Sequence, residues 1–302
     1  MNVKFGVIAD LHTEFIHDAP ERLERFFSEC EREGCDFCVE LGDFCPPGEI
    51  HAHEKRKIHA LIEKFHIPFY HVIGNHDVDD HKKDTVAEHL GMSGAYYSFD
   101  FGNVHFVVLD ACYFSDGERR ISYNEGNYRA VKGSAPIIPD AELEWLCRDL
   151  ANAEYPSVVF SHQSLIESRS SISNAEALRA VFAEAPQGVM LSVCGHEHVD
   201  RLDEKDGVYY YCLNSASYYW AGSEYSHTTY GEKIEKEYRH LRSVFPYSEP
   251  LFAIVKIGGG VIEIKGREGN IVGATPQELG FKKVGLIDKV TASVKDRTIR
   301  IN

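Results

Sequence analysis

The 302-residue sequence contains no apolar run that approaches the roughly 20 residues of a membrane-spanning helix. Its opening, MNVKFGVIAD, has no basic segment followed by an apolar stretch and a cleavage site. We therefore expect a cytoplasmic protein that has no membrane partner.

Basic residues are also scarce, since 32 Lys and Arg stand against 47 Asp and Glu, and the net charge is −15. Surfaces that bind the phosphate backbone usually carry clustered Lys and Arg, so we expect no nucleic-acid polymer as partner. The densest basic run, EKRK at 54–57, is interpreted as the solvated face of a helix. An acidic protein can still bind a phosphate if metal ions supply local positive charge.

A second CxxC pair, which a structural zinc site would need, is missing. Of the eight cysteines, Cys35 and Cys38 form the single CxxC, inside GCDFCVELGD. We interpret this segment as a strand, which would place the two side chains on opposite faces. The sequence thus favours buried, reduced thiols over a metal site at this motif.

The first 75 residues alternate between strand and helix patterns. Apolar runs at 3–9, 35–41 and 68–73 predict strands, and the segments 19–34 and about 49–65 predict helices with one apolar face. This βαβαβ order is typical of a mostly parallel sheet in an α/β fold.

The second half continues the pattern without repeating the sequence. We expect a hairpin around DFGN, helices at 139–153 and 174–185, and further strands that end near 162, 196 and 214. The tail, 251–302, is expected to be β-rich, with short antiparallel strands. No linker is visible, so we expect one domain over 1–302, with 110–138 and 215–250 as loops or insertions that border an active site.

Polar side chains gather where the predicted strands end. These strand-end residues are Asp10, His12, Asp43, Asn75, His76, His162, His196 and His198. Open α/β sheets assemble their sites at the carboxyl ends of strands, so we expect these side chains to lie together. Gly42, Gly74 and Gly195 precede three of the clusters, where glycine allows a sharp turn.

Without His76, the set offers seven oxygen and imidazole donors and no thiolate. Such donors suit Mn, Fe or Zn, and seven of them divide between two ions if one carboxylate bridges both. Two adjacent metal ions are a common arrangement for displacement at phosphorus. The other eleven histidines, His240 among them, are interpreted as surface or core residues.

The ordered motifs DLH, GD, GNHD, a later single His and GHEH resemble those of the calcineurin-like metallophosphoesterases over residues 3–200. The resemblance implies a four-layer α/β/β/α sandwich with mixed sheets and a dinuclear metal site. It implies that one metal is held by Asp10, His12 and His198, the other by Asn75, His162 and His196, and that Asp43 bridges both.

The same resemblance assigns catalytic roles to two further residues. His76 would contact the phosphate or protonate the leaving group, and Asp77 would orient His76. The implied mechanism is attack on phosphorus by a hydroxide that bridges the two metal ions.

Departures from the family pattern narrow the expected substrate. The segment GDFCPPG lacks the arginine of the Ser/Thr phosphatases, and Pro46 stands where purple acid phosphatases carry a metal-bound tyrosine. We therefore expect a hydrolase of a small phosphodiester, pyrophosphate or nucleotide. A phosphomonoesterase, including a protein phosphatase, and a non-catalytic scaffold remain as alternatives.

An aromatic stretch follows the last motif. Tyr218, Tyr219 and Trp220 show neither strand nor helix periodicity, so they either fill an irregular core or border the cleft and stack on a substrate ring. In the second interpretation, a second phosphate would be bound by Arg119, Arg120 or Arg129.

Overall fold

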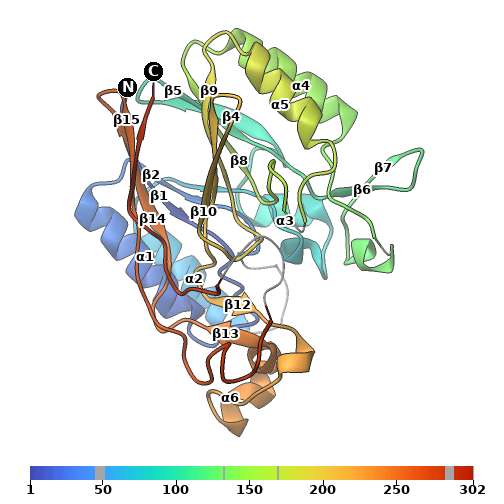
Figure 1. Ribbon diagram of the computed structural model, residues 1–302, viewed down its shortest axis with the longest axis vertical. Helices are drawn as coiled ribbons and strands as arrows, with labels where there is room; N and C mark the ends of the chain where they lie inside the picture. Colours follow the sequence, from blue (N-terminus) through green and yellow to red (C-terminus); the bar gives the residue numbers. More distant parts are fainter. Residues whose placement is uncertain (45–51, 132, 169, 283–288, 302) are drawn as a thin grey trace.

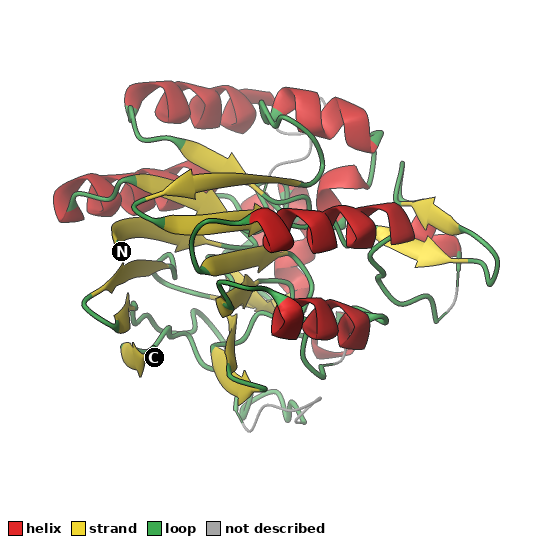
Figure 2. Cartoon of the chain, turned by 90° about the horizontal axis from the view of Figure 1, so that it is seen from above, coloured by secondary structure: helices red, strands yellow, loops and turns green. Residues whose placement is uncertain are grey.

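The computed structural model describes residues 1–44, 52–131, 133–168, 170–282 and 289–301. Pro46 therefore lies outside the described residues. Two six-stranded mixed sheets lie face to face, and helices cover both outer faces (Figures 1 and 2). The expected four-layer α/β/β/α sandwich is confirmed.

The first sheet combines the start and the end of the chain. Its strand order is β16-β15-β14-β1-β2-β3, in which β1, β2 and β3 are parallel and β14, β15 and β16 are antiparallel. Its strands are β1 (Asn2–Ile8), β2 (Phe37–Glu40), β3 (Phe69–His71), β14 (Ala253–Gly258), β15 (Val261–Lys265) and β16 (Arg297–Arg300). The prediction of antiparallel strands in the tail is confirmed.

The second sheet is built from the middle of the chain. Its order is β10-β11-β9-β8-β5-β4, with four parallel inner strands and antiparallel strands at both edges. Its strands are β4 (Tyr97–Phe101), β5 (Val104–Val108), β8 (Ser157–Ser161), β9 (Val189–Cys194), β10 (Arg201–Lys205) and β11 (Val208–Cys212).

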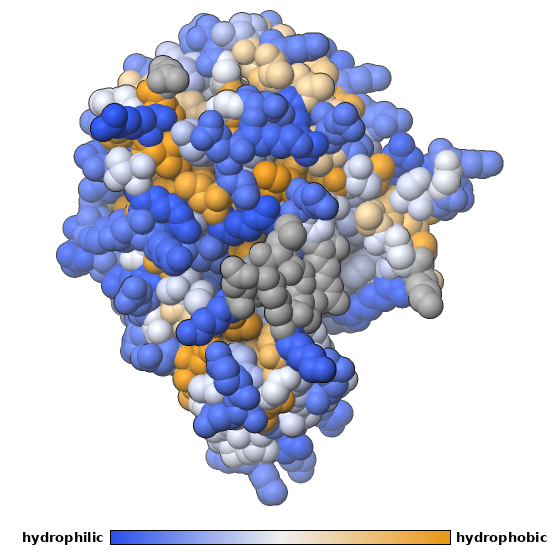
Figure 3. Space-filling model, viewed as in Figure 1, coloured by the Kyte–Doolittle hydropathy of each residue, from blue (hydrophilic) through white to orange (hydrophobic). Residues whose placement is uncertain are grey.

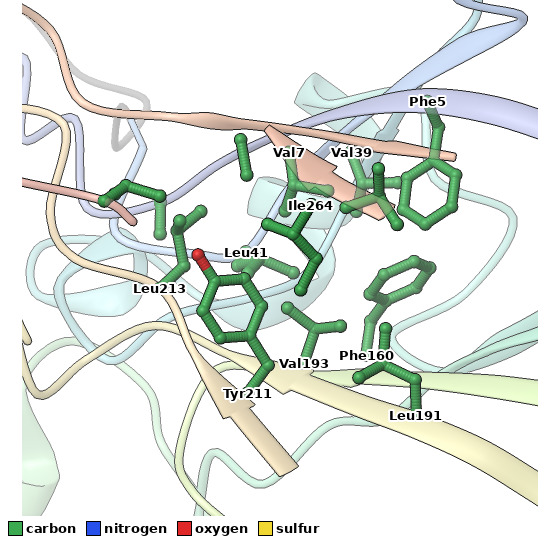
Figure 4. Close-up of a cluster of buried hydrophobic side chains, with 14 of the residues drawn as sticks. Phe5, Val7, Val39, Leu41, Phe160, Leu191, Val193, Tyr211, Leu213 and Ile264 are labelled. Carbon is green, nitrogen blue, oxygen red and sulfur yellow. The ribbon is translucent and has the colours of Figure 1, made fainter. Parts of the chain in front are cut away.

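Apolar side chains from both sheets interdigitate in the main core. Phe5 and Val39 of the first sheet face Phe160, Val193 and Tyr211 of the second (Figure 4). Phe5 stacks on Phe37 at 5.1 Å between ring centroids, and such aromatic pairs add to the stabilisation from buried area. The face of the molecule shown in Figure 3 is mostly hydrophilic, with smaller apolar patches between the polar residues.

Helices α1 (Ala19–Glu33) and α2 (Ala52–Lys64) cover the first sheet, and α4 (Asp140–Asn152) and α5 (Ala175–Glu184) cover the second. Helix α1 begins next to Pro20, buries a Leu, Phe and Cys stripe, and ends at Gly34, which takes a left-handed φ of 67°. Short helices α3 (Lys83–His89) and α6 (Glu232–Glu237) lie in the connections. No helix among the described residues is long and apolar enough to cross a membrane.

The two segments predicted as loops or insertions, 110–138 and 215–250, contain regular secondary structure. Residues 110–138 include the hairpin of β6 (Tyr113–Ser115) and β7 (Arg120–Ser122) and the 3₁₀ turn η2 (Asn127–Ala130). Residues 215–250 include β12 (Tyr218–Trp220), η3 (Ser223–Tyr225), α6, η4 (Arg239–Ser243) and β13 (Val244–Pro246). The prediction that 218–220 lack strand structure is wrong, because β12 pairs with β13.

The prediction for the CxxC motif needs a correction. Strand β2 begins at Phe37, so Cys35 precedes the strand. The alternation of side chains between the two faces of a strand therefore does not apply to Cys35. Cys35 and Cys38 both pack into the cluster under α1, on the same side of the sheet. Cys38 is buried as expected, whereas Cys35 is partly exposed.

Candidate metal centre

Five strand-end residues hold their backbone in the left-handed region. The φ angles of Asp10, His12, Asp43, His196 and His198 lie between 51° and 67°. Such a conformation costs roughly 1–3 kcal/mol at a residue other than glycine, and it persists where the surrounding structure enforces it. In this chain it turns the side chains that follow β1, β2 and β9 towards one another.

The glycines beside these residues are required for close approach. A Cβ on Gly74 would lie 2.2 Å from the backbone nitrogen of Asp43, and one on Gly195 would lie 2.6 Å from Oδ2 of Asp10. Gly42 is the one of the three with a positive φ, 97°. The expectation of a sharp turn holds for Gly42, and the other two are needed because a side chain would not fit.

One group of donors consists of Asp10, His12 and His198, all buried. Nε2 of His198 lies 3.3 Å from Oδ1 of Asp10 and 3.4 Å from Nε2 of His12. Nδ1 of His198 donates to the backbone oxygen of Tyr218 at 2.7 Å. This hydrogen bond fixes the tautomer, so Nε2 presents a lone pair to the cluster.

A second group consists of Asp43, His162 and His196. Nε2 of His162 lies 3.2 Å from Oδ2 of Asp43 and 3.1 Å from Nδ1 of His196, while its Nδ1 donates to the backbone oxygen of Leu41 at 2.8 Å. The same Oδ2 of Asp43 lies 3.7 Å from Nε2 of His12 in the first group. Asp43 thus lies between the two groups.

The surroundings of Asn75 and the chemistry of the two donor groups show whether metal ions fit this site. Oδ1 of Asn75 is buried and has no hydrogen-bond partner, which is costly unless a cation binds it. Carboxylate oxygens and imidazole nitrogens converge without enough protons to pair them all, and such a donor set suits borderline divalent metals. The residues therefore fit two metal ions.

The pKa values of His162 and His196 are shifted in opposite directions. Burial works against a charged His162, but the Asp43 carboxylate outweighs it and raises the pKa of His162 to about 10. Burial, followed by the neighbouring His162, lowers the pKa of His196 to about 3. Metal binding requires neutral imidazoles, so it would displace the proton from His162.

His76 lies beside the two groups and is held by Asp79. Nδ1 of His76 is 2.7 Å from Oδ2 of Asp79, and its backbone nitrogen donates to Oδ1 of Asp43 at 2.7 Å. Burial opposes protonation, but Asp43 and the hydrogen bond to Asp79 raise the pKa of His76 to about 9. Asp79 also accepts from the hydroxyl of Tyr128 at 2.6 Å and pairs with Arg129.

Asp77 occupies a different place from the one implied by the family pattern. Its carboxylate accepts from the backbone nitrogens of Asp43 at 2.9 Å, Phe44 at 2.9 Å and Gly74 at 2.8 Å. Burial and then Asp43 raise the pKa of Asp77 to about 7, and the backbone donors counter this shift. Asp77 joins the loops after β2 and β3, and Asp79 is the carboxylate that contacts His76.

A cavity of about 770 Å³ opens beside the donors. Of the expected substrate residues, its lining includes Arg129, Tyr218, Tyr219 and Trp220. Tyr218 and Tyr219 are buried, whereas Trp220 is 44% exposed, so the core interpretation suits the tyrosines better than the tryptophan.

Arg119 and Arg120 are not among the cavity residues. Both lie at the β6–β7 hairpin, which projects from the body of the molecule (Figures 1 and 2). Arg119 pairs with Asp116 at 2.8 Å, so its charge is satisfied within the hairpin turn. The structure therefore does not bring these two arginines to the donors.

Sequence reasoning missed three residues of the cavity wall. Glu14 lies two residues after His12, and its Oε2 is buried without a hydrogen-bond partner. Phe15 stacks on His12, and His240 contacts Phe15 with 4.2 Å between ring centroids. His240 is exposed, as the surface interpretation expected, and it also lines the cavity. Only the proximity of Glu14 and Phe15 to the DLH motif could have indicated their position.

Two mixed sheets between helices, with two groups of metal donors at the strand ends, define a metal-dependent phosphoesterase architecture. Residues 3–200 match the calcineurin-like phosphoesterase family, and the chain belongs to it. The protein is accordingly a hydrolase of phosphoric esters, and the donor groups and the family together indicate a dinuclear metal site.

Solved structures share the fold. A dimetal phosphatase from Danio rerio is 17% identical, with a TM-score of 0.67 and 99% of each chain covered. The purple acid phosphatase PPD1 from yellow lupin (Lupinus luteus) seeds is 12% identical, with a TM-score of 0.57, and the match covers 100% of this chain and 54% of that one. No curated protein matches the sequence.

Proposed function

We propose that this phosphoesterase hydrolyses a small phosphodiester, pyrophosphate or nucleotide, and that its metal ions are held by the seven strand-end donors. One ion would be bound by Asp10, His12 and His198, the other by Asn75, His162 and His196, with Asp43 between them. The unpartnered Oδ1 of Asn75 supports its inclusion, because an amide oxygen adds a ligand without adding charge.

The bound ions would supply an activated water and neutralise charge on the phosphoryl oxygens. The residues of the chain have separate tasks. His76, held by Asp79, carries a proton that it can donate to the leaving oxygen, and a positive charge that attracts the phosphate. Arg129 lines the cavity next to Asp79 and would bind an outer phosphate oxygen.

The chemistry of the cavity lining favours a substrate that carries more than a single phosphate group. Phe15, Trp220 and His240 form an aromatic part of the lining, in which the His240 ring lies next to those of Phe15 and Trp220. The lining also includes the small polar residues Ser164, Ser168 and Ser192. A diester or a pyrophosphate could contact both the aromatic and the polar lining residues with separate groups, whereas a phosphomonoester has one such group.

A substrate panel with the variant Trp220→Ala tests this proposal. Stacking on one base is worth roughly 1–3 kcal/mol, so KM for a nucleotide substrate should rise by about tenfold or more. A small phosphate ester without an aromatic ring should be unaffected. Phe101→Ala is the matched control, because Phe101 is similarly exposed, at 40%, and lies outside the cavity lining.

Each alternative class predicts a different result in the same assays. A monoesterase would turn over phosphomonoesters faster than every diester and pyrophosphate in the panel, with Mn, Fe, Zn, Co or Ni present. A scaffold purified without chelator would contain no stoichiometric metal. Equal effects of Trp220→Ala on both substrate types would remove the support for an aromatic substrate group.

A further inference from the structure

Three cysteines meet where helix α1 ends, and the metal centre uses none of them. The side chains of Cys30, Cys35 and Cys38 pack in the same cluster under α1. Cys30 and Cys38 are buried, and Cys35 is partly exposed. The cluster thus combines one thiol that solvent can reach with two that it cannot.

The end of α1 has the geometry that brings Cys30 and Cys35 together. The backbone nitrogen of Cys35 donates to the oxygen of Cys30 at 2.9 Å, and Gly34 donates to Glu31 at 3.1 Å. With Gly34 in the left-handed region, these bonds form a Schellman motif. In this motif the side chain after the glycine frequently packs on the side chain five positions earlier, and Cys35 and Cys30 accordingly belong to one packed cluster.

The surroundings of Cys30 leave its sulfur little freedom to move away. A Cβ on Gly6 would lie 2.3 Å from Sγ of Cys30 and 3.0 Å from the ring of Phe26, so the thiol fills the space above this glycine. The neighbouring Cys30, and to a lesser degree Lys4, lowers the pKa of the Cys35 thiol against the effect of burial. Cys35 is also the partly exposed sulfur of the pair, so it is the one that a dissolved oxidant can reach.

We propose that Cys35 and Cys30 form a reversible disulfide when the protein meets a hydroperoxide, with Cys35 as the reacting thiol and Cys30 as the resolving thiol. The thiolate of Cys35 attacks the hydroperoxide, so an S–O bond forms and the O–O bond breaks; the alkoxide that leaves takes up the proton released when the Cys35 thiol ionised, and departs as an alcohol. The sulfur of Cys30 then attacks the sulfur of Cys35. An S–S bond forms, the S–O bond breaks, and the departing hydroxide takes the proton of Cys30 as water.

Two thiols are thereby oxidised by two electrons, and the hydroperoxide is reduced to alcohol and water. The product would tie the last turn of α1 to the residues that lead into β2. A metal role for the cluster is not favoured, because among the described residues the groups able to hold an ion are those of Asp10, His12, His198 and Asp43, His162, His196.

The test uses hydrogen peroxide as the probe on the purified, folded enzyme. Free thiols are then alkylated, and the digested protein is analysed by mass spectrometry. We expect a cross-linked peptide that joins Cys30 to Cys35 and has lost two hydrogen atoms, and we expect a thiol reductant to reverse the bond.

Two serine variants give the contrast. Cys35→Ser should reduce the cross-linked species to background, whereas Cys147→Ser, at the exposed cysteine of α4, should leave it unchanged. Circular dichroism checks that Cys35→Ser is folded, and sulfenic acid on Cys35 in Cys30→Ala provides a second readout of the reacting thiol. The proposal is overturned if peroxide joins Cys35 to Cys38 instead, or if it oxidises Cys35 to a sulfinic acid without any cross-link.

Discussion

Replacing Asp77 by asparagine tests whether this carboxylate acts in catalysis or holds the loops that carry the donors. Oδ2 of Asp77 accepts from the backbone nitrogens of Asp43 and Gly74, and Oδ1 accepts from that of Phe44. An amide keeps one accepting oxygen, and its NH₂ group must then face a backbone N–H. One buried donor therefore loses its partner, and the remaining bonds lose their charge assistance.

These losses can be estimated from the three bonds. A buried unsatisfied donor costs about 1–3 kcal/mol, and weaker remaining bonds add to it, so Asp77→Asn should lose roughly 2–4 kcal/mol of unfolding free energy. For a protein of this size the corresponding fall in Tm is on the order of 3–6 °C. Turnover measured well below the new Tm should change much less than stability does.

Asp79→Asn is the matched comparison. It removes the charge that faces Nδ1 of His76, so turnover should fall while the loops after β2 and β3 keep their hydrogen bonds. Melting curves with and without chelator, and kcat at a low temperature, separate the two effects. The reasoning is refuted if Asp77→Asn slows turnover by about 10²-fold or more and leaves Tm within about 1 °C.

Three further predictions concern single side chains. Asp43→Asn removes the charge that lies between both donor groups, so we expect loss of at least one metal by elemental analysis and near loss of hydrolysis; full occupancy with normal turnover would contradict this. His76→Ala should keep both metals yet slow turnover by roughly 10²–10⁴-fold, and less for substrates with acidic leaving groups; an equal loss for all leaving groups would favour pure charge stabilisation. Burial opposes the protonation of His105, but Asp149 and Asp100 outweigh burial and raise the pKa of His105 in the folded protein. The protonated His105 therefore contributes its full stabilisation below pH 6.5, and this contribution is lost as pH rises through the higher pKa of the folded state. The Tm difference between wild type and His105→Gln should therefore shrink from pH 6 to pH 9, and a constant difference would refute the assignment.

The positions of the donors could be predicted from the sequence because the rule that governs them is local. Each donor follows a predicted strand directly, and the carboxyl ends of neighbouring parallel strands meet at one edge of a sheet. The structure accordingly brings Asp10, His12 and His198 into one group and Asp43, His162 and His196 into another. The need for Gly74 and Gly195 was also visible, although its cause is the lack of space for a side chain.

Contacts that depend on tertiary structure could not be predicted in the same way. Asp77 and Asp79 are both acidic and both close to His76 in sequence, and only the 3₁₀ turn η1 (His76–Val78) decides which of them reaches its ring. Trp220 reaches the cavity because β12 pairs with β13, a partner more than 20 residues away that has no motif. Arg119 and Arg120 have the right chemistry for a phosphate but lie at the hairpin instead of the cavity.

The place of β14 in the first sheet has a consequence for folding order. β1 pairs on one side with β2, which follows soon after it, and on the other side with β14, where Phe5 lies opposite Val255. A chain emerging from the ribosome would hold the whole region of the family match, residues 3–200, while one edge of β1 still lacked its partner. Because contacts between distant residues slow folding, completion of this sheet should be a late step, and until then the edge of β1 would be open to pairing with another chain.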